Sequence, residues 1–293
     1  MSTNTPPPRT WKTRQLVALL VANMMLACGG LLVRWADTGA VAAGFWRVTL
    51  ALPILLLVAW REPGGLARIA PRRLVVLLCA GGIFGLNIAA WHIGIDKTKL
   101  GNAALFGNAG SLVLMAWGVI AARRPPRLPE LLAIGAALGG AALLMVGSLE
   151  IGHANLTGDL MCLLAGLLFA VYVLLLNSAR RELPPVTVLA GSMLASAPVL
   201  LAIATLRGEA ILPHDWTPLI LLAFSSQIVG QGLLINYLRY FSPLMIGVAL
   251  LTQPAISALV GWIAFAETLS VQDVIGMVLL ATALVMARAG DRA

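Results

Sequence analysis

Residues 158–178 read GDLMCLLAGLLFAVYVLLLNS, and beyond Asp159 this stretch contains no charged residue. A helix needs about 20 predominantly apolar residues to cross the hydrocarbon core of a bilayer. Nine other blocks have a similar length and composition, and the ten predicted spans are residues 14–34, 41–60, 72–95, 99–121, 129–148, 158–178, 186–206, 217–238, 243–265 and 271–288. The sequence therefore predicts an all-α membrane protein with ten transmembrane helices.

The composition excludes a soluble globular protein. Of the 293 residues, 60% are hydrophobic and 11% are charged, whereas ordinary soluble domains contain about 25% charged residues. The three cysteines lie inside apolar blocks and lack the spacing of a metal site or a disulfide framework. We therefore expect no metal and no cofactor. No small-residue cleavage site follows the first block, so we expect the first span to be retained.

The basic residues predict how the spans are oriented. The net charge is +8, and most Lys and Arg residues lie in the short connections between apolar blocks. If the N-terminus is cytoplasmic, 15 of the 20 Lys and Arg residues lie on that side and four on the other, with Arg47 inside a span. Cytoplasmic loops carry an excess of Lys and Arg, so both termini are predicted to be cytoplasmic, with tails at residues 1–13 and 289–293. The same distribution argues against a nucleic-acid partner.

The two halves of the chain repeat each other. Matches occur at an offset of 145 residues as far as the fourth span and of 141 residues beyond it. Prolines and tryptophans are scarce inside spans, and they match in the pairs Pro53–Pro198 and Trp117–Trp262. We predict two repeats of five spans each, at residues 14–148 and 149–288. An odd number of spans makes the second repeat enter the membrane from the opposite side, and inverted repeats are typical of secondary transporters.

Several motifs resemble one transporter family. Residues 158–160 (GDL) and 165–172 (AGLLFAVY) resemble the opening of the second repeat in the EamA-type transporters of the drug/metabolite transporter superfamily. Residues 45–47 (FWR) resemble the aromatic–Arg element of that family's second span. The resemblance implies a ten-helix bundle in which spans 1–4 and 6–9 surround a central cavity while spans 5 and 10 lie outside.

The end of the chain carries the same resemblance with one departure. Residues 253–254 (QP) and 261–267 are similar to the family's ninth span, including Glu267 at its end. The matching position in the first repeat is Ala122, so the symmetric glutamate is missing. In length and bacterial character the chain is most similar to aromatic amino-acid exporters of the YddG type.

Polar side chains near the middle of the spans are the candidates for a substrate site. An unpaired polar group is costly in hydrocarbon, so such groups face the bundle interior or a watered cavity. Amides beside aromatic rings suit a zwitterion with a large apolar side chain. The alternative for each amide is a hydrogen bond between helices. The candidate substrate-binding residues are Asn23, Arg47, Asn87, Trp91, Asn108, Tyr172, Gln227, Gln231 and Gln253.

Two ionisable residues have two interpretations each. Arg47 either binds a substrate carboxylate through a bidentate fork or snorkels to the outer membrane interface. His92 either relays protons or lies at the outer interface beside Asp96 and Lys97, and we expect the interfacial position. Glu267 is expected to make a solvated or helix-end contact.

Prolines and glycines inside the spans indicate bends and close packing. Pro53, Pro198 and Pro254 each remove a backbone hydrogen bond and permit a kink, so they are the hinge candidates. The pairs Gly81–Gly85 and Gly135–Gly139 form GxxxG steps, which allow helices to approach closely.

The expected function is that of a secondary transporter in a bacterial inner membrane. It would export amino acids, aromatic or other large neutral ones, or related small metabolites by alternating access. No Walker A motif is present, so ATP does not drive transport directly. Arg47 is the only cation well inside a span, which favours a neutral or singly charged substrate.

The alternatives are a drug or other metabolite transporter of the same superfamily, an integral membrane enzyme, or a channel. Membrane enzymes bring clustered ionisable groups to one site, whereas the three histidines are scattered along this sequence. We therefore expect no enzyme. Ten spans can enclose a cavity within one chain, so we expect a monomer whose partners are a small-molecule substrate and the lipid bilayer.

Overall fold

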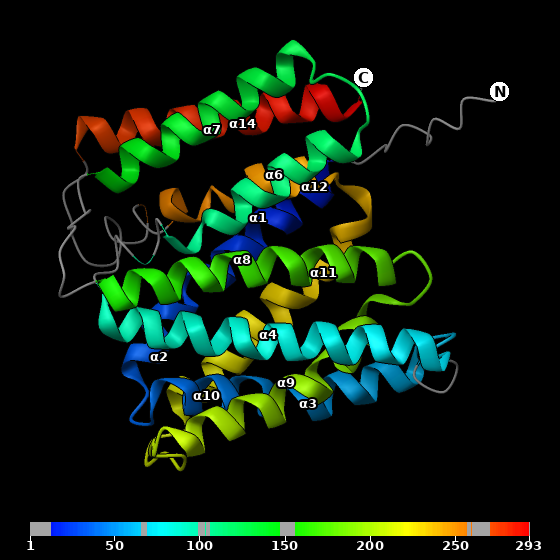
Figure 1. The fold of residues 1–293 in the computed structure, drawn as a ribbon, viewed down its shortest axis with the longest axis vertical. Coiled ribbons are helices and arrows are strands. Elements are labelled where there is room, and N and C mark those ends of the chain that lie inside the picture. Colours follow the sequence, from blue (N-terminus) through cyan, green and yellow to red (C-terminus); the bar gives the residue numbers. More distant parts are fainter. Residues whose placement is uncertain are drawn as a thin grey trace.

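The computed structural model describes residues 13–65, 69–98, 103, 106–146, 156–256, 259 and 270–292, which are largely helical and contain no strand (Figure 1). In chain order the elements are α1 (Thr13–Ala27), α2 (Gly29–Trp35), α3 (Ala40–Arg61), α4 (Pro71–Lys97), α6 (Ala109–Ala121), α7 (Leu128–Val146), α8 (Leu156–Ala179), α9 (Pro185–Leu206), α10 (Thr217–Leu222), the π-helix η2 (Ala223–Gln231), α11 (Gly232–Tyr237), the 3-10 helix η3 (Leu238–Tyr240), α12 (Pro243–Leu250) and α14 (Val271–Arg292).

The apolar helices coincide with the predicted spans. Four shorter apolar helices fall on the fourth, fifth, ninth and tenth predicted spans. The first residues of the fourth span and the last residues of the ninth, including Glu267, lie outside the described residues. Six helices are long and apolar enough to cross a membrane, and these are Thr13–Trp35, Ala40–Arg61, Pro71–Lys97, Leu156–Ala179, Pro185–Leu206 and Thr217–Tyr240.

The helix α3 illustrates how these helices divide between core and lipid. Val48, Ala51 and Leu55 are buried in the core, whereas Ile54 and Leu57 on the same helix are 52% and 49% exposed. Large apolar side chains gathered on an exposed face mark a surface that contacts a membrane or a partner. Together with its length, this face is typical of a membrane-spanning helix.

Two pairs of helices matched by the sequence offsets, α3 with α9 and α7 with α14, pack against each other, and so do α6 and α12, which belong to the matched fourth and ninth spans. The α7–α14 pair forms one edge of the bundle (Figure 1). The helix α4 packs against both α8 and α9, and α1 packs against η2. The centre of the bundle is therefore built from α1, α3, α4, α8, α9 and η2, and these elements carry most of the candidate site.

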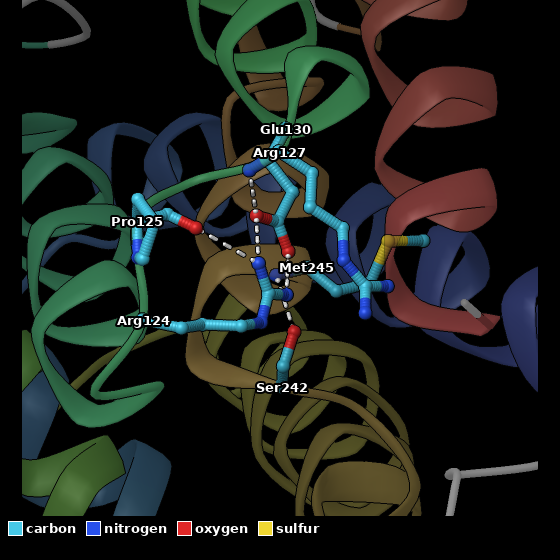
Figure 2. A network of polar contacts seen from close by, with 6 residues as sticks. All are labelled: Arg124, Pro125, Arg127, Glu130, Ser242 and Met245. Atoms are coloured by element: carbon cyan, nitrogen blue, oxygen red, sulfur yellow. Dashed lines mark hydrogen bonds and ion pairs between the residues drawn. The ribbon is translucent and has the colours of Figure 1, made fainter.

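One carboxylate stabilises the turn between α6 and α7 through hydrogen bonds (Figure 2). Glu130 accepts hydrogen bonds from Arg124 at 2.6 and 2.9 Å and from the backbone amide of Arg127 at 2.8 Å. The Glu130 carboxylate raises the pKa of the Arg124 guanidinium above its ordinary value. Ser242 lies beside this network and caps α12 by accepting from the Met245 amide at 3.2 Å. These contacts fix the turn on which α6 and α7 reverse direction.

The first GxxxG step provides close packing, and the second does not. A Cβ on Gly81 would overlap the backbone carbonyl of Ser192, and a Cβ on Gly85 would lie 3.1 Å from the carbonyl oxygen of Ser196, so α4 and α9 cross at this step. The expected step at Gly135 and Gly139 is wrong in position, because nothing lies within 4 Å of a Cβ on Gly135. Gly140 instead makes the close approach between α7 and α14.

Two neighbouring glycines of α4 give a matched test of this packing. Gly81→Ala is expected to lower thermal stability by about 1–3 kcal/mol, the usual cost of overpacking, because the added methyl meets backbone rather than a movable side chain. Gly82→Ala is the control, since a Cβ there has nothing within 4 Å. Thermal melts of both variants in detergent measure the difference. Equal melting temperatures would contradict the crossing of α4 and α9 at Gly81.

Candidate functional site

A buried cation lies at the centre of the candidate site. Arg47 is in the second turn of α3 and is 8% exposed, and its Nε donates a 3.0 Å hydrogen bond to Oε1 of Gln227 on η2. Of the two interpretations of Arg47, snorkelling to the interface does not fit this burial and this hydrogen bond. Among the described residues, no carboxylate lies within ion-pair distance of Arg47. An uncompensated buried charge is costly, so this guanidinium is suited to an anionic group brought by a ligand.

Aromatic and sulfur-containing side chains surround this pair. Gln227 is fully buried and donates from Nε2 to the Met193 sulfur of α9 at 2.9 Å. Tyr172 of α8 lies within electrostatic reach of Arg47 and stacks on Phe84 of α4, with ring centroids 4.4 Å apart. Four different helices and η2 thus converge on one polar cluster. The structure brings three of the candidate residues, Arg47, Tyr172 and Gln227, into this cluster.

Two of the predicted asparagines join helices by hydrogen bonds. Asn23 of α1 donates from Nδ2 to the backbone carbonyl of Ala249 on α12 at 2.5 Å. Asn87 of α4 donates to the carbonyl of Ala165 on α8 at 2.7 Å. Trp91 lies one turn beyond Asn87 and packs against the small cluster that contains Cys162 of α8. These contacts correspond to the alternative of interhelical hydrogen bonding.

Several buried polar atoms of the site have no hydrogen-bond partner in the described part of the chain. They are the Tyr172 hydroxyl, Oε1 of Gln231 and Oδ1 of Asn23. Ser192 lies near the Tyr172 hydroxyl, although outside hydrogen-bonding geometry. A buried polar atom without a partner costs about 1–3 kcal/mol. Such atoms are natural contacts for a polar ligand.

His92 lies beside the first residue of α3, near the helix ends, but it is buried between helices instead of exposed at the interface beside Asp96 and Lys97. The side chain is 1% exposed, and Nδ1 lies 2.6 Å from the backbone carbonyl oxygen of Ala40 at the start of α3. That carbonyl fixes the proton on Nδ1, while Nε2 has no described partner. Its sequence neighbours Asp96 and Lys97 misled the prediction, because the helix face on which His92 lies points toward α3.

Asn108 and Gln253, which the 145-residue offset matches, both lie where a span is interrupted. Phe106 and Gly107 are helical, Asn108 is in a turn, and α6 begins after it. In the second half α12 ends at Leu250, two turn residues follow, and Gln253 begins the next helical stretch. Irregular backbone at membrane depth is tolerated where protein or a watered cavity surrounds it.

The three hinge candidates fall in two different settings. Pro53 lies inside α3 and Pro198 inside α9, and both rings are exposed on the outer surface of the bundle. Pro254 is buried and follows the interruption after α12. The matched prolines thus occupy the same position along two antiparallel helices that pack against each other.

The sequence analysis missed the π-helix η2. It runs for nine residues, Ala223–Gln231, between α10 and α11. π-helices are rare and often mark functional sites. This one directs Gln227 toward α3 and α9, while Ser226 donates to the Met25 carbonyl of α1 at 3.1 Å. The helix that contains η2 is less apolar than the other five long helices, but low hydropathy does not distinguish a π-helix from an α-helix, so the sequence pattern gives no direct signal for it.

The fold and the apolar helices define a multi-pass helical membrane protein with a buried polar cluster between its helices. The sequence model of the EamA-like transporter family matches twice, at residues 13–146 and 156–289. The chain belongs to the EamA-like transporter family.

Comparison with known proteins gives named relatives and a structural match. Threonine/homoserine exporter RhtA of Escherichia coli (strain K12) is 29% identical over 257 residues, which cover 87% of this chain and 84% of that protein. The protein of the same name from Salmonella typhimurium (strain LT2) is 28% identical over 256 residues, with the same coverage. A crystal structure matches 95% of this chain and 98% of its own chain with a TM-score of 0.80 at 15% identity, which shows a shared fold.

Proposed function

We propose that this protein exports amino acids through the membrane by alternating access and that Arg47 binds their carboxylate. The observation that carries the proposal is the buried guanidinium without a described carboxylate partner. With Nε held by Gln227, the two terminal nitrogens are left to form the fork that matches a carboxylate. One cation in the site fits a substrate with one negative group.

The arrangement of the helices supports alternating access. Two pairs of matched helices, α3–α9 and α7–α14, pack against each other, as expected if the two repeats are related by an approximate two-fold axis in the membrane plane. The interruptions near Asn108 and Gln253 occupy matched positions, and transporters commonly bind substrate at broken helices. We propose two inverted repeats of five spans in a bacterial inner membrane, both termini cytoplasmic, and a monomer without enzymatic activity.

The substrate side chain has two candidates. The relatives named above export threonine and homoserine, and the unpartnered Tyr172 hydroxyl and Gln231 Oε1 are suited to a substrate hydroxyl. We therefore place small hydroxylated amino acids first. The second candidate is an aromatic or other large neutral amino acid, as the sequence predicts, because the Phe84–Tyr172 stack supplies aromatic surface.

Flux measurements in proteoliposomes containing the purified chain test both the export of amino acids and the choice between the two candidate side chains. Labelled threonine is expected to show saturable flux that homoserine inhibits and threonine amide, which lacks the carboxylate, does not. Preferential inhibition by phenylalanine or tryptophan would select the second candidate. Equal inhibition by threonine and its amide would contradict the role of Arg47, and absence of flux for every amino acid would overturn the proposed function.

A further inference from the structure

A carboxylate that follows α9 caps the start of α3. Glu209 accepts a 2.9 Å hydrogen bond from the backbone amide of Ala42 through Oε2, and its Oε1 accepts from Arg207 at 2.8 Å. The Glu209 side chain is 9% exposed. The adjoining backbones also pair, since the Gly39 amide donates to the Ala210 carbonyl at 3.0 Å. These contacts hold the beginning of α3 to the end of α9.

A second carboxylate makes the same connection at the opposite ends of the two helices. Glu62, directly after α3, accepts hydrogen bonds from the backbone amides of Val186 and Thr187 at 3.3 and 2.8 Å. Its Oε2 also accepts from the Thr187 hydroxyl at 2.8 Å. These amides lie in the first turn of α9, where backbone donors have no partner within the helix. The positive end of a helix dipole also favours a carboxylate.

The backbone donors of the two contacts are equivalent by position in the repeat, and each carboxylate lies in the connection that follows one of the two matched helices. The amides of Ala42 and Thr187 are separated by 145 residues, the offset that relates the repeats. Glu62 lies two residues before Gly64 and Glu209 directly after Gly208, and both glycines have positive φ, 76° and 66°, which lets the chain turn back after each helix. Both helices have 22 residues, so the two contacts are about 33 Å apart and lie at opposite membrane faces.

We propose that Glu62 and Glu209 are the two latches of the transport cycle. By a latch we mean the hydrogen bonds that join one of these carboxylates to the start of the neighbouring helix. The pathway opens on one side of the membrane when the hydrogen bonds on that side break while those on the other side stay intact. Both contacts are present in the structure, so α3 and α9 are held together at both ends. The proposal rests on the proposed alternating access and adds the residues that control it. Arg47 lies on α3 between the two latches, so a single movement of α3 against α9 connects the site to either face.

Distances between spin labels at each end of the pair test the latches without any substrate. One pair, Arg61→Cys with Arg181→Cys, reports on the Glu62 end, and a second pair, Leu206→Cys with Trp35→Cys, reports on the Glu209 end. All four positions are exposed, and the native cysteines are replaced first. Glu209→Ala is expected to lengthen the distance of the second pair alone, and Glu62→Ala that of the first pair alone.

Three further variants separate a latch from a general loss of structure. Glu62→Gln and Glu209→Gln keep an acceptor oxygen and lose the charge, so they are expected to give smaller shifts at the same ends. Gly39→Ala is expected to reproduce Glu209→Ala with every charge retained, because the added Cβ would overlap the Glu209 side chain. Glu182→Ala, which removes a carboxylate paired with Arg73 near the Glu62 end, is the control and should shift neither distance.

The distance measurements can fail or succeed independently of the flux measurements that test the proposed substrate. A shift confined to the end that carries the substitution supports the latches even if no amino acid is transported. Unchanged distances in both alanine variants, or the same shift at both ends, would overturn the latches and leave the flux measurements untouched. Transport of amino acids with unchanged distances would therefore reject this inference alone.

Discussion

Arg47→Met is expected to lower carboxylate-dependent amino-acid flux about 100-fold. Truncating one partner of a buried, hydrogen-bonded charge pair costs about 2–5 kcal/mol, and about 1.4 kcal/mol corresponds to each factor of ten. Met fills a similar volume but offers no donor to a carboxylate. Initial rates of labelled threonine flux in proteoliposomes, at matched protein content, measure the effect.

The flux of Arg47→Lys, together with the melting temperatures, shows whether the loss of flux in Arg47→Met is a loss of substrate binding. Arg47→Lys keeps the charge but has no planar fork and no Nε to donate to Gln227, so it should retain a fraction of the flux with a raised KM. Arg47→Met should melt at or above the wild-type temperature, because replacing an unpaired buried charge with an apolar group relieves its desolvation. A large drop in melting temperature together with lost flux would instead assign Arg47 a structural role.

The positions of the spans could be predicted because membrane thickness fixes the length of an apolar helix. The predicted spans 41–60 and 186–206 differ by one residue or less at each end from α3 (Ala40–Arg61) and α9 (Pro185–Leu206). Here charged or Pro-containing connections mark where the hydrocarbon ends. The interruptions of the spans escaped prediction, because an irregular turn next to Asn108 or Leu251 depends on what packs around it.

The environment of each polar side chain also depends on partners distant in the sequence. Arg47 could be read as snorkelling or buried until Gln227, 180 residues later, was placed beside it. His92 is close in sequence to charged residues, yet its hydrogen-bond partner is the Ala40 carbonyl on another helix. Spacing along one helix predicts which residues share a face, and it does not predict which helix that face meets.

The two glutamines of η2 are expected to affect transport in different ways. Gln227 positions the guanidinium, so Gln227→Leu should raise the KM of threonine and of its isostere valine by a similar factor, about tenfold for one lost charge-assisted hydrogen bond. Gln231 has no role in holding Arg47, and its Oε1 has no partner among the described residues. If it accepts the substrate hydroxyl, Gln231→Leu should leave valine unchanged and remove the preference for threonine.

The ratio of kcat/KM for threonine and valine is therefore the decisive quantity. In the wild type the ratio should favour threonine by up to about tenfold, because one net hydrogen bond contributes about 0.5–1.5 kcal/mol. Gln227→Leu should preserve the ratio and Gln231→Leu should bring it close to one, while melting of Gln231→Leu should be unchanged or raised because an unsatisfied buried oxygen is removed. A wild-type ratio near one would exclude recognition of a hydroxyl by Gln231. The aromatic surface of Phe84 and Tyr172 would then decide which side chain the site accepts, since ring stacking does not depend on a hydroxyl.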